Sequence, residues 1–178
     1  PEPFTFGYLP FYILLGVACG VFSGYFNKIY LSVSGTFQGI KSPVSRVLTG
    51  GALLGAIVLV FPPLYGEGYD ILNAFLRDDI RESTANSMFY DLPVDGWWIL
   101  LFLAGLLILK VLATGITLGS GGVGGIFAPT LFMGGTLGYL FGKVIDKLHI
   151  TQALPVGSFA LVGMAGLIWS TLGPAEQQ

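Results

Sequence analysis

Long uncharged stretches of Leu, Ile, Val, Ala, Gly and Phe alternate with short polar segments along this chain of 178 residues. A helix needs about 20 apolar residues to cross a bilayer, and five stretches approach or reach that length. They predict helices over residues 8–33, 44–64, 97–118, 126–145 and 153–172. The stretches are continuous, whereas transmembrane β-strands are short and alternate between two faces. The pattern therefore predicts an all-α fold, a polytopic transmembrane helical bundle.

Composition agrees with a membrane protein, because 53% of the residues are hydrophobic and only 10% are charged. A soluble domain carries about 25% charged residues, so a water-facing surface could not be covered. Disorder requires low hydrophobicity and high net charge, and the formal charge here is −2. No basic patch suited to nucleic acid is present. With one cysteine, Cys19, and one histidine, His149, we expect neither an internal disulfide nor a metal site.

The few charges predict an orientation in the membrane. Lys28, Lys41 and Arg46 make the connection from residue 28 to residue 46 purely basic, whereas residues 67–95 are mainly acidic. Basic connections tend to remain in the cytoplasm, so we expect the first connection inside and the acidic one outside. Ser42 followed by Pro43 predicts an N-cap and the first residue of the second helix.

Glycines recur at every fourth position in three stretches, at 16, 20 and 24, at 51 and 55, and at 134, 138 and 142. Small residues at this spacing let helices approach closely in lipid, so we expect tight helix packing. The chain starts without Met and ends in polar residues. We therefore expect residues 1–178 to be a single transmembrane domain that is a piece of a larger membrane protein. The alternative is a protein whose disordered ends are lacking.

A glycine run interrupts the longest neutral stretch, between Lys110 and Lys143. Each glycine costs about 1 kcal/mol relative to alanine within a helix, so the run Gly119–Gly125 predicts a break between two helices. Irregular backbone at membrane depth must be buried in protein or line a cavity. The second helix is expected to start near Ile126 to Pro129. Its free amides and positive dipole end could bind an anion without a charged side chain.

The context of the glycine run argues against two other kinds of binding site. A dinucleotide fingerprint must follow a β-strand, and a phosphate-binding loop needs Lys and Ser or Thr after the glycines; neither condition holds. No serine-nucleophile elbow is present, so we expect no enzymatic activity. A tight packing turn remains an alternative. Lys110 lies inside an apolar span and should face protein or water. It could attract anions, or snorkel or pair with a carbonyl group.

The segment from Lys110 to Gly142, KVLATGITLGSGGVGGIFAPTLFMGGTLGYLFG, resembles the CLC family of chloride channels and chloride/proton exchangers. Gly125 to Pro129 is similar to the GxFxP anion-selectivity motif of that family. The segments GEGY at 66–69 and GSFALVGMA at 157–165 are also similar to family segments. The resemblance implies six helices, including a short one at about 68–75.

The resemblance also implies a chloride site at which the amides of Ile126 and Phe127 point at the anion. The predicted anion-binding residues are Gly125, Ile126, Phe127 and Ala128, supported by Gly119, Ser120, Gly121, Gly122, Gly124 and Pro129. Implied partners are chloride or a similar anion, the lipid bilayer, the remaining helices of the parent chain and a second copy in a homodimer. No cofactor is implied beyond chloride as the substrate.

Three elements of the family's anion pathway are missing from this sequence. The serine of a GSGIP segment, the gating glutamate of a GxEGP segment and a late tyrosine do not occur. We therefore expect this chain to supply one wall of an anion pathway, in either a channel or a proton-coupled exchanger. A non-transporting helical scaffold and a transporter of another small anion remain as alternatives.

Overall fold

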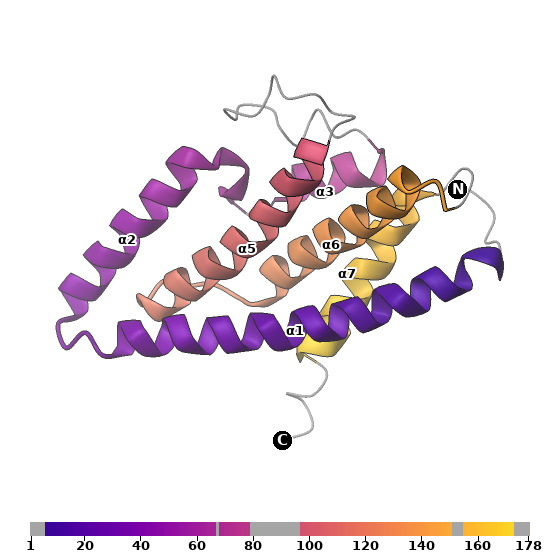
Figure 1. The fold of residues 1–178 in the computed structure, drawn as a ribbon. Coiled ribbons are helices and arrows are strands. Elements are labelled where there is room, and N and C mark those ends of the chain that lie inside the picture. Colours follow the sequence, from indigo (N-terminus) through magenta and orange to yellow (C-terminus); the bar gives the residue numbers. More distant parts are fainter. Residues whose placement is uncertain (1–5, 67, 79–96, 151–154, 173–178) are drawn as a thin grey trace.

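The computed structural model describes residues 6–66, 68–78, 97–150 and 155–172, and within them it contains helices and no strands. The order of elements is η1 (Phe6–Tyr8), α1 (Leu9–Gln38), α2 (Pro43–Val60), η2 (Pro62–Leu64), α3 (Tyr69–Leu76), α5 (Trp97–Gly119), α6 (Phe127–Lys147) and α7 (Val156–Leu172) (Figure 1). The predicted all-α class is confirmed. Glu67 and most of the predicted acidic connection lie outside the described residues.

The first helix is longer than predicted, because α1 ends at Gln38 and not near residue 33. Its polar residues stay helical, and the hydroxyl of Thr36 donates to the Ser32 carbonyl at 2.9 Å. Lys28 therefore lies within α1, and the predicted connection from 28 to 46 shrinks to residues 39–42. The prediction for Ser42 is confirmed, since its side chain accepts a hydrogen bond from the Ser45 amide and Pro43 opens α2.

The second and last helices also differ from their predicted ranges. α2 ends at Val60, short of residue 64, because Pro62 and Pro63 lead the chain into the short 3₁₀ helix η2. The described part of α7 begins at Val156. The break in the long neutral stretch is confirmed, with α5 ending at Gly119 and α6 beginning at Phe127.

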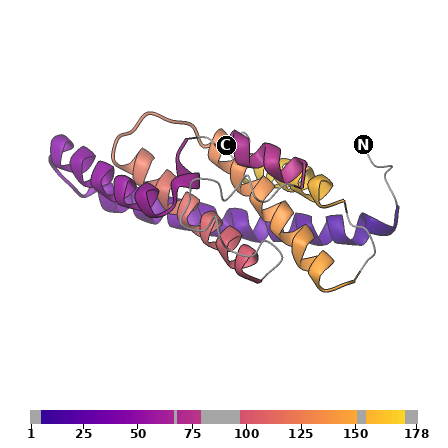
Figure 2. The ribbon, with the colours of Figure 1, turned by 90° about the horizontal axis from the view of Figure 1, so that it is seen from above.

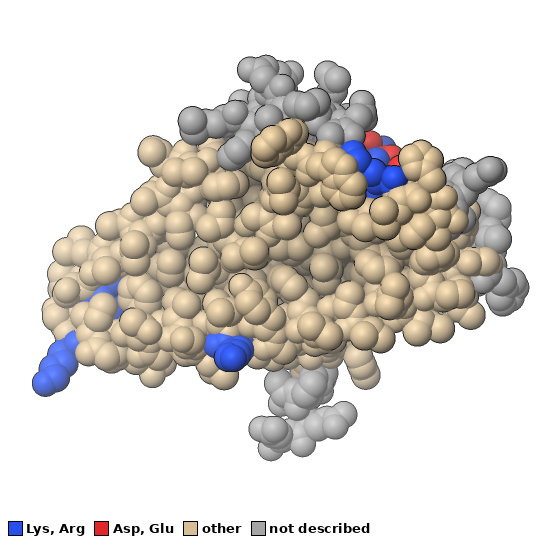
Figure 3. Space-filling model, viewed as in Figure 1, with Lys and Arg blue, Asp and Glu red and all other residues tan. Residues whose placement is uncertain are grey.

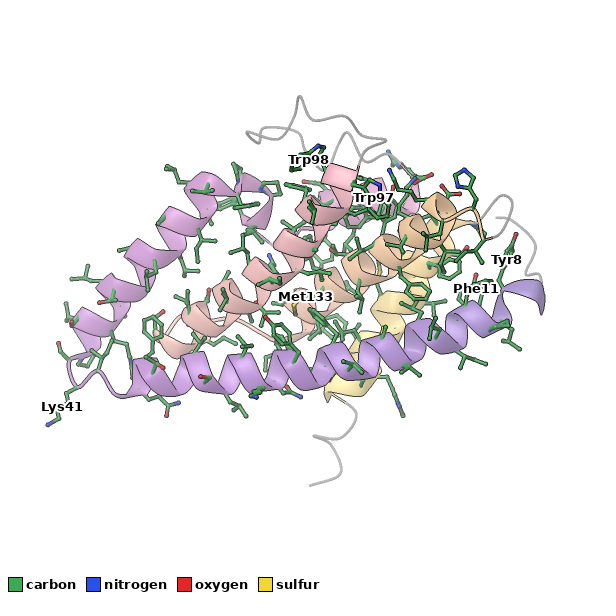
Figure 4. All side chains as sticks on the ribbon, in the orientation of Figure 1. Tyr8, Phe11, Lys41, Trp97, Trp98 and Met133 are labelled. Atoms are coloured by element: carbon green, nitrogen blue, oxygen red, sulfur yellow. The ribbon has the colours of Figure 1, made fainter. Side chains whose placement is uncertain are left out.

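Helix α5 lies in the middle of the bundle, between α1, α2 and α6 (Figures 1 and 2). In the most apolar 18-residue stretch of α5, 67% of the residues are buried, whereas in the corresponding stretch of α2 only 6% are buried. α7 packs between α1 and α6, and the core runs through α1, α3, α5, α6 and α7. Met133 of α6, labelled in Figure 4, is fully buried in this core.

One of the three glycine sets makes the predicted close packing. A Cβ at Gly134 or Gly138 would overlap the backbone of α7 at Gly163 and Phe159, so the two helices touch through their main chains. At Gly16, Gly20 and Gly24, by contrast, no described atom lies within 4 Å of a Cβ position, and the same holds for the Gly51 and Gly55 pair. For these two sets, close packing on another helix stays a prediction, because the described residues show no such contact.

Three described helices, α1, α2 and α5, are long and apolar enough to cross a membrane, and α7 is apolar but shorter. The sequence predicted five spans, and α6 is one that does not reach the hydropathy of the other three. Its glycines, threonines and tyrosine lower its mean hydropathy. In Figure 3, blue atoms lie at the lower left and along the lower edge of the molecule, and blue and red atoms lie together at the upper right, with tan surface between them. Lys41 lies at the lower left, and Trp97 and Trp98 at the start of α5 lie near the upper edge (Figure 4).

Candidate anion site at the break between α5 and α6

Helix α5 ends in a Schellman motif, in which two amides beyond the helix bond back to its last carbonyl groups. The Gly122 amide donates to the Thr117 carbonyl at 2.8 Å, and the Gly121 amide donates to the Leu118 carbonyl at 3.3 Å. Gly121 has a φ of +98°, a conformation that favours glycine. The negative end of α5 is therefore capped by its own loop.

Helix α6 begins without such a cap. Ile126 occupies the N-cap position and has no side-chain hydrogen bond to the helix, and the first amide bonded along the helix is that of Thr130, to the Ile126 carbonyl at 3.0 Å. Among the described residues, the amides of Ile126, Phe127 and Ala128 have no acceptor. Pro129 carries no N–H and fits the first turn. The positive end of α6 thus presents unpaired amides.

The start of α6 borders a cavity of about 490 Å³ between α2, α5 and the turn after η2. In Figure 1, α6 begins closer to the middle of the molecule than the point at which α5 ends. Most of the cavity wall is apolar. It is lined by Leu54, Gly55, Val58, Leu64, Tyr65, Gly66, Lys110, Ala113, Thr114, Thr117, Leu118, Gly124, Gly125, Ala128 and Pro129.

Among the described residues that line this cavity, Lys110 alone carries a charged side chain. It is 5% exposed, and its ammonium group donates to the carbonyl groups of Leu64 at 3.2 Å and Gly66 at 2.8 Å. The same nitrogen lies 4.9 Å from the centre of the Phe132 ring. The predicted pairing with a carbonyl group is confirmed. The Lys110 ammonium group is therefore held in the wall of the cavity that the start of α6 borders.

The structure divides the predicted site residues into three groups. Gly124, Gly125, Ala128 and Pro129 line the cavity, and Ile126 and Phe127 lie beside it without being part of its wall. The remaining members support the loop from outside. Gly119 packs against Ser34 and Phe37 of α1, and Ser120 packs against Gly50 of α2. Gly121 and Gly122 form the cap of α5. The Phe127 side chain beside the cavity is 55% exposed.

Sequence reasoning missed the contributions of α2 and of the turn from Leu64 to Gly66, which form the wall facing the glycine loop. No charge or motif in α2 marks it as a wall, and its apolar residues also fit a simple membrane span. Among the residues that the structure describes, no group of three His, Cys, Asp or Glu side chains could hold a metal ion. Within the described residues, the candidate site therefore offers backbone amides and the Lys110 ammonium group.

A sequence profile described as "Voltage gated chloride channel" matches residues 1–173. The chain belongs to this family. A ClcB-like protein of Ralstonia nicotianae is 33% identical over 162 residues, which are 90% of this chain and 33% of the relative. An "H(+)/Cl(-) exchange transporter ClcA" of Vibrio parahaemolyticus is 34% identical over 166 residues, 90% of this chain and 32% of the relative.

A plant relative extends the comparison. The "Chloride channel protein CLC-f" of Arabidopsis thaliana is 30% identical over 174 residues, 91% of this chain and 20% of that protein. The chain thus spans about a third or less of the length of the curated relatives it matches. Membership of the CLC family, together with several apolar helices, identifies a multi-pass integral membrane protein.

Proposed function

We propose that this chain forms one wall of the anion pathway of a CLC-type chloride channel or chloride/proton exchanger, in which the amides at Gly125 to Ala128 bind the anion. The relatives are named as chloride channels or as H⁺/Cl⁻ exchange transporters. No cofactor and no enzymatic step are part of the proposal. Family membership also leads us to propose a homodimer of the full-length protein.

The uncapped start of α6 at a cavity that contains a buried lysine carries this proposal. A helix N-terminus with unpaired amides favours an anion by roughly 0.3 to 2 kcal/mol through the dipole, and more hydrogen bonds strengthen the contact. The negative end of α5 repels an anion only weakly, because its last carbonyl groups accept hydrogen bonds from the amides of Gly121 and Gly122. Lys110 adds a positive charge where the wall is otherwise apolar.

The first test measures chloride efflux from liposomes that contain the full-length protein, under a chloride gradient with valinomycin present. The variant replaces the amide of residue 127 with an ester, which removes the N–H and keeps the Phe127 side chain. A hydrogen bond to a charged group contributes about 1.5–3 kcal/mol. We therefore expect the apparent chloride affinity to fall by about tenfold or more.

An ester at Val123 is the matched control, because that residue lies in the same loop, is fully exposed and does not line the cavity. Its chloride affinity should equal that of the unmodified protein. Equal affinities for all three proteins would contradict an anion site at Phe127. If the unmodified protein moved no chloride while a known channel did, the scaffold alternative would replace the proposal, and competition by organic anions would reveal a different substrate.

A further inference from the structure

The short helix α3 ends in a residue with unusual backbone geometry. Asp78 has a φ of +56° and follows Arg77, the C-cap of α3; its amide donates to the Phe75 carbonyl at 3.2 Å. Asp and Asn tolerate this conformation better than other non-glycine residues. At the end of α3, the Asp78 side chain reaches α6.

The Asp78 carboxylate binds two side chains of α6 that lie one turn apart. Its Oδ1 accepts a hydrogen bond from the Tyr139 hydroxyl at 2.5 Å and lies 2.8 Å from the Lys143 ammonium nitrogen. Tyr139 is fully buried, and the side chains of Lys143 and Asp78 are 24% and 50% exposed. Hydrogen bonds to charged groups are stronger than neutral ones. These three residues form what we call the Asp78 cluster.

Helix α3 is also fixed to α6 along its length. The Phe75 ring stacks on the Tyr139 ring with 4.5 Å between centroids, and Gly68 packs directly on the Phe132 ring, with no room for a Cβ. The contacts are seven residues apart on both helices, so α3 follows about two turns of α6 in the same direction. α3 also touches α7, because the Leu76 carbonyl lies against Gly157.

The other end of α3 leads directly to the cavity wall. Gly68, the N-cap of α3, is two residues from Gly66, whose carbonyl group accepts the bond from Lys110. Tyr65 and Gly66 line the cavity. The start of α3 and the Leu64–Gly66 turn are therefore close neighbours along the chain, and the turn shares the cavity with the start of α6.

We propose that Asp78 is a positioning residue: by binding Tyr139 and Lys143 it holds α3 on α6 and thereby fixes the Leu64–Gly66 turn at the cavity. The consequence for chloride affinity rests on the function proposed above, whereas the position of the turn does not. Removal of the Asp78 charge loosens the turn, and the Lys110 ammonium loses its fixed place in the wall.

The test measures how fast a water-soluble thiol reagent labels a cysteine at Tyr65 in the full-length protein. Tyr65 is 79% exposed and lines the cavity, whereas the native Cys19 is 1% exposed. Asp78→Asn keeps an acceptor for Tyr139 and removes the charge that pairs with Lys143. Tyr139→Phe keeps the ring stack and removes the hydroxyl. Each variant should raise the labelling rate by about threefold to tenfold.

The double variant decides whether both residues act through one cluster. The effects of residues in one hydrogen-bonded network are not additive, so the double variant should label little faster than the stronger single variant. Asp146→Asn is the control, because Asp146 is an exposed acid of α6 within one turn of Lys143. Its labelling rate should equal that of the unmodified protein.

Three results would separate this proposal from the proposed function. Equal labelling rates for Asp78→Asn and Asp146→Asn, with only a lower melting temperature for the former, would overturn the positioning role. Faster labelling of the cluster variants with a lower apparent chloride affinity supports both proposals. Faster labelling in a protein that moves no chloride in any form supports the positioning role and refutes the proposed function.

Discussion

A single lysine sets the charge of the cavity wall. The ammonium group of Lys110 donates hydrogen bonds to the backbone carbonyl groups of Leu64 and Gly66, which belong to the same cavity wall. An unpaired lysine at the centre of a membrane helix costs about 2.5 to 3.5 kcal/mol on insertion scales. The sequence predicted that Lys110 must avoid lipid, but it did not identify the acceptors, which lie 46 and 44 residues away along the chain at Leu64 and Gly66.

Replacement of Lys110 by Met should weaken apparent chloride affinity in the full-length protein by about tenfold, because a charge near the anion is lost. Lys110→Arg keeps the charge and should recover most of that affinity. Thr114→Val is the control, since Thr114 lines the same cavity one turn away and is uncharged. The measurement is the chloride dependence of efflux. A loss of affinity as large in Thr114→Val would assign the effect to cavity shape.

At the scale of elements, the glycine run predicted the helix break correctly. Five glycines within seven residues destabilise a helix strongly, whatever packs around it. The same spacing rule predicted contact for three glycine sets, yet only the set in α6 touches a described neighbour. The spacing shows that one face of a helix carries only small residues. It does not identify the helix that packs on that face. Likewise, α1 continues through its first polar residues and ends only at Gln38, four residues before the Ser42 cap of α2.

The contact between α6 and α7 makes Gly138 intolerant of a side chain. Gly138→Val would drive its side chain into the backbone at Phe159 and Ala160, and overpacking costs about 1–3 kcal/mol. The melting temperature of the detergent-solubilised protein should fall. Gly105→Ala, on a face of α5 without described neighbours, should leave it unchanged or raise it, since alanine favours helix. Equal melting temperatures for both variants would contradict the close contact.

For the whole molecule, the outer faces of α1 and α2 carry large apolar side chains that are mostly exposed, such as Val21 at 72% and Leu59 at 81%. Exposed apolar area on this scale marks a surface that contacts lipid or other protein. The chain spans about a third of the length of its bacterial relatives, so both coverings are available to the full-length protein. Sequence reasoning could foresee the apolar faces, but not which of them the chain itself buries.

Cysteine labelling in intact cells tests both the covering and the predicted orientation. A cysteine at Val21 should resist a water-soluble thiol reagent, and a cysteine at Lys41 should react only after the membrane is permeabilised, because the basic connection is expected in the cytoplasm. A cysteine at Trp98, which lies away from Lys41 near the upper edge of the molecule in Figure 4, should react from outside. Labelling of the cysteine at position 41 in intact cells would contradict the predicted orientation and indicate the opposite one.

The main-chain contact between α6 and α7 also limits how the protein can move. Gly134 and Gly138 leave no gap to the backbone at Gly163 and Phe159, so sliding one helix along the other would force main-chain atoms to collide. The two helices must therefore travel as one rigid body. In the proposed anion pathway, we therefore expect any motion that opens or closes the path past the amides of α6 to occur at α2, on the opposite side of the cavity.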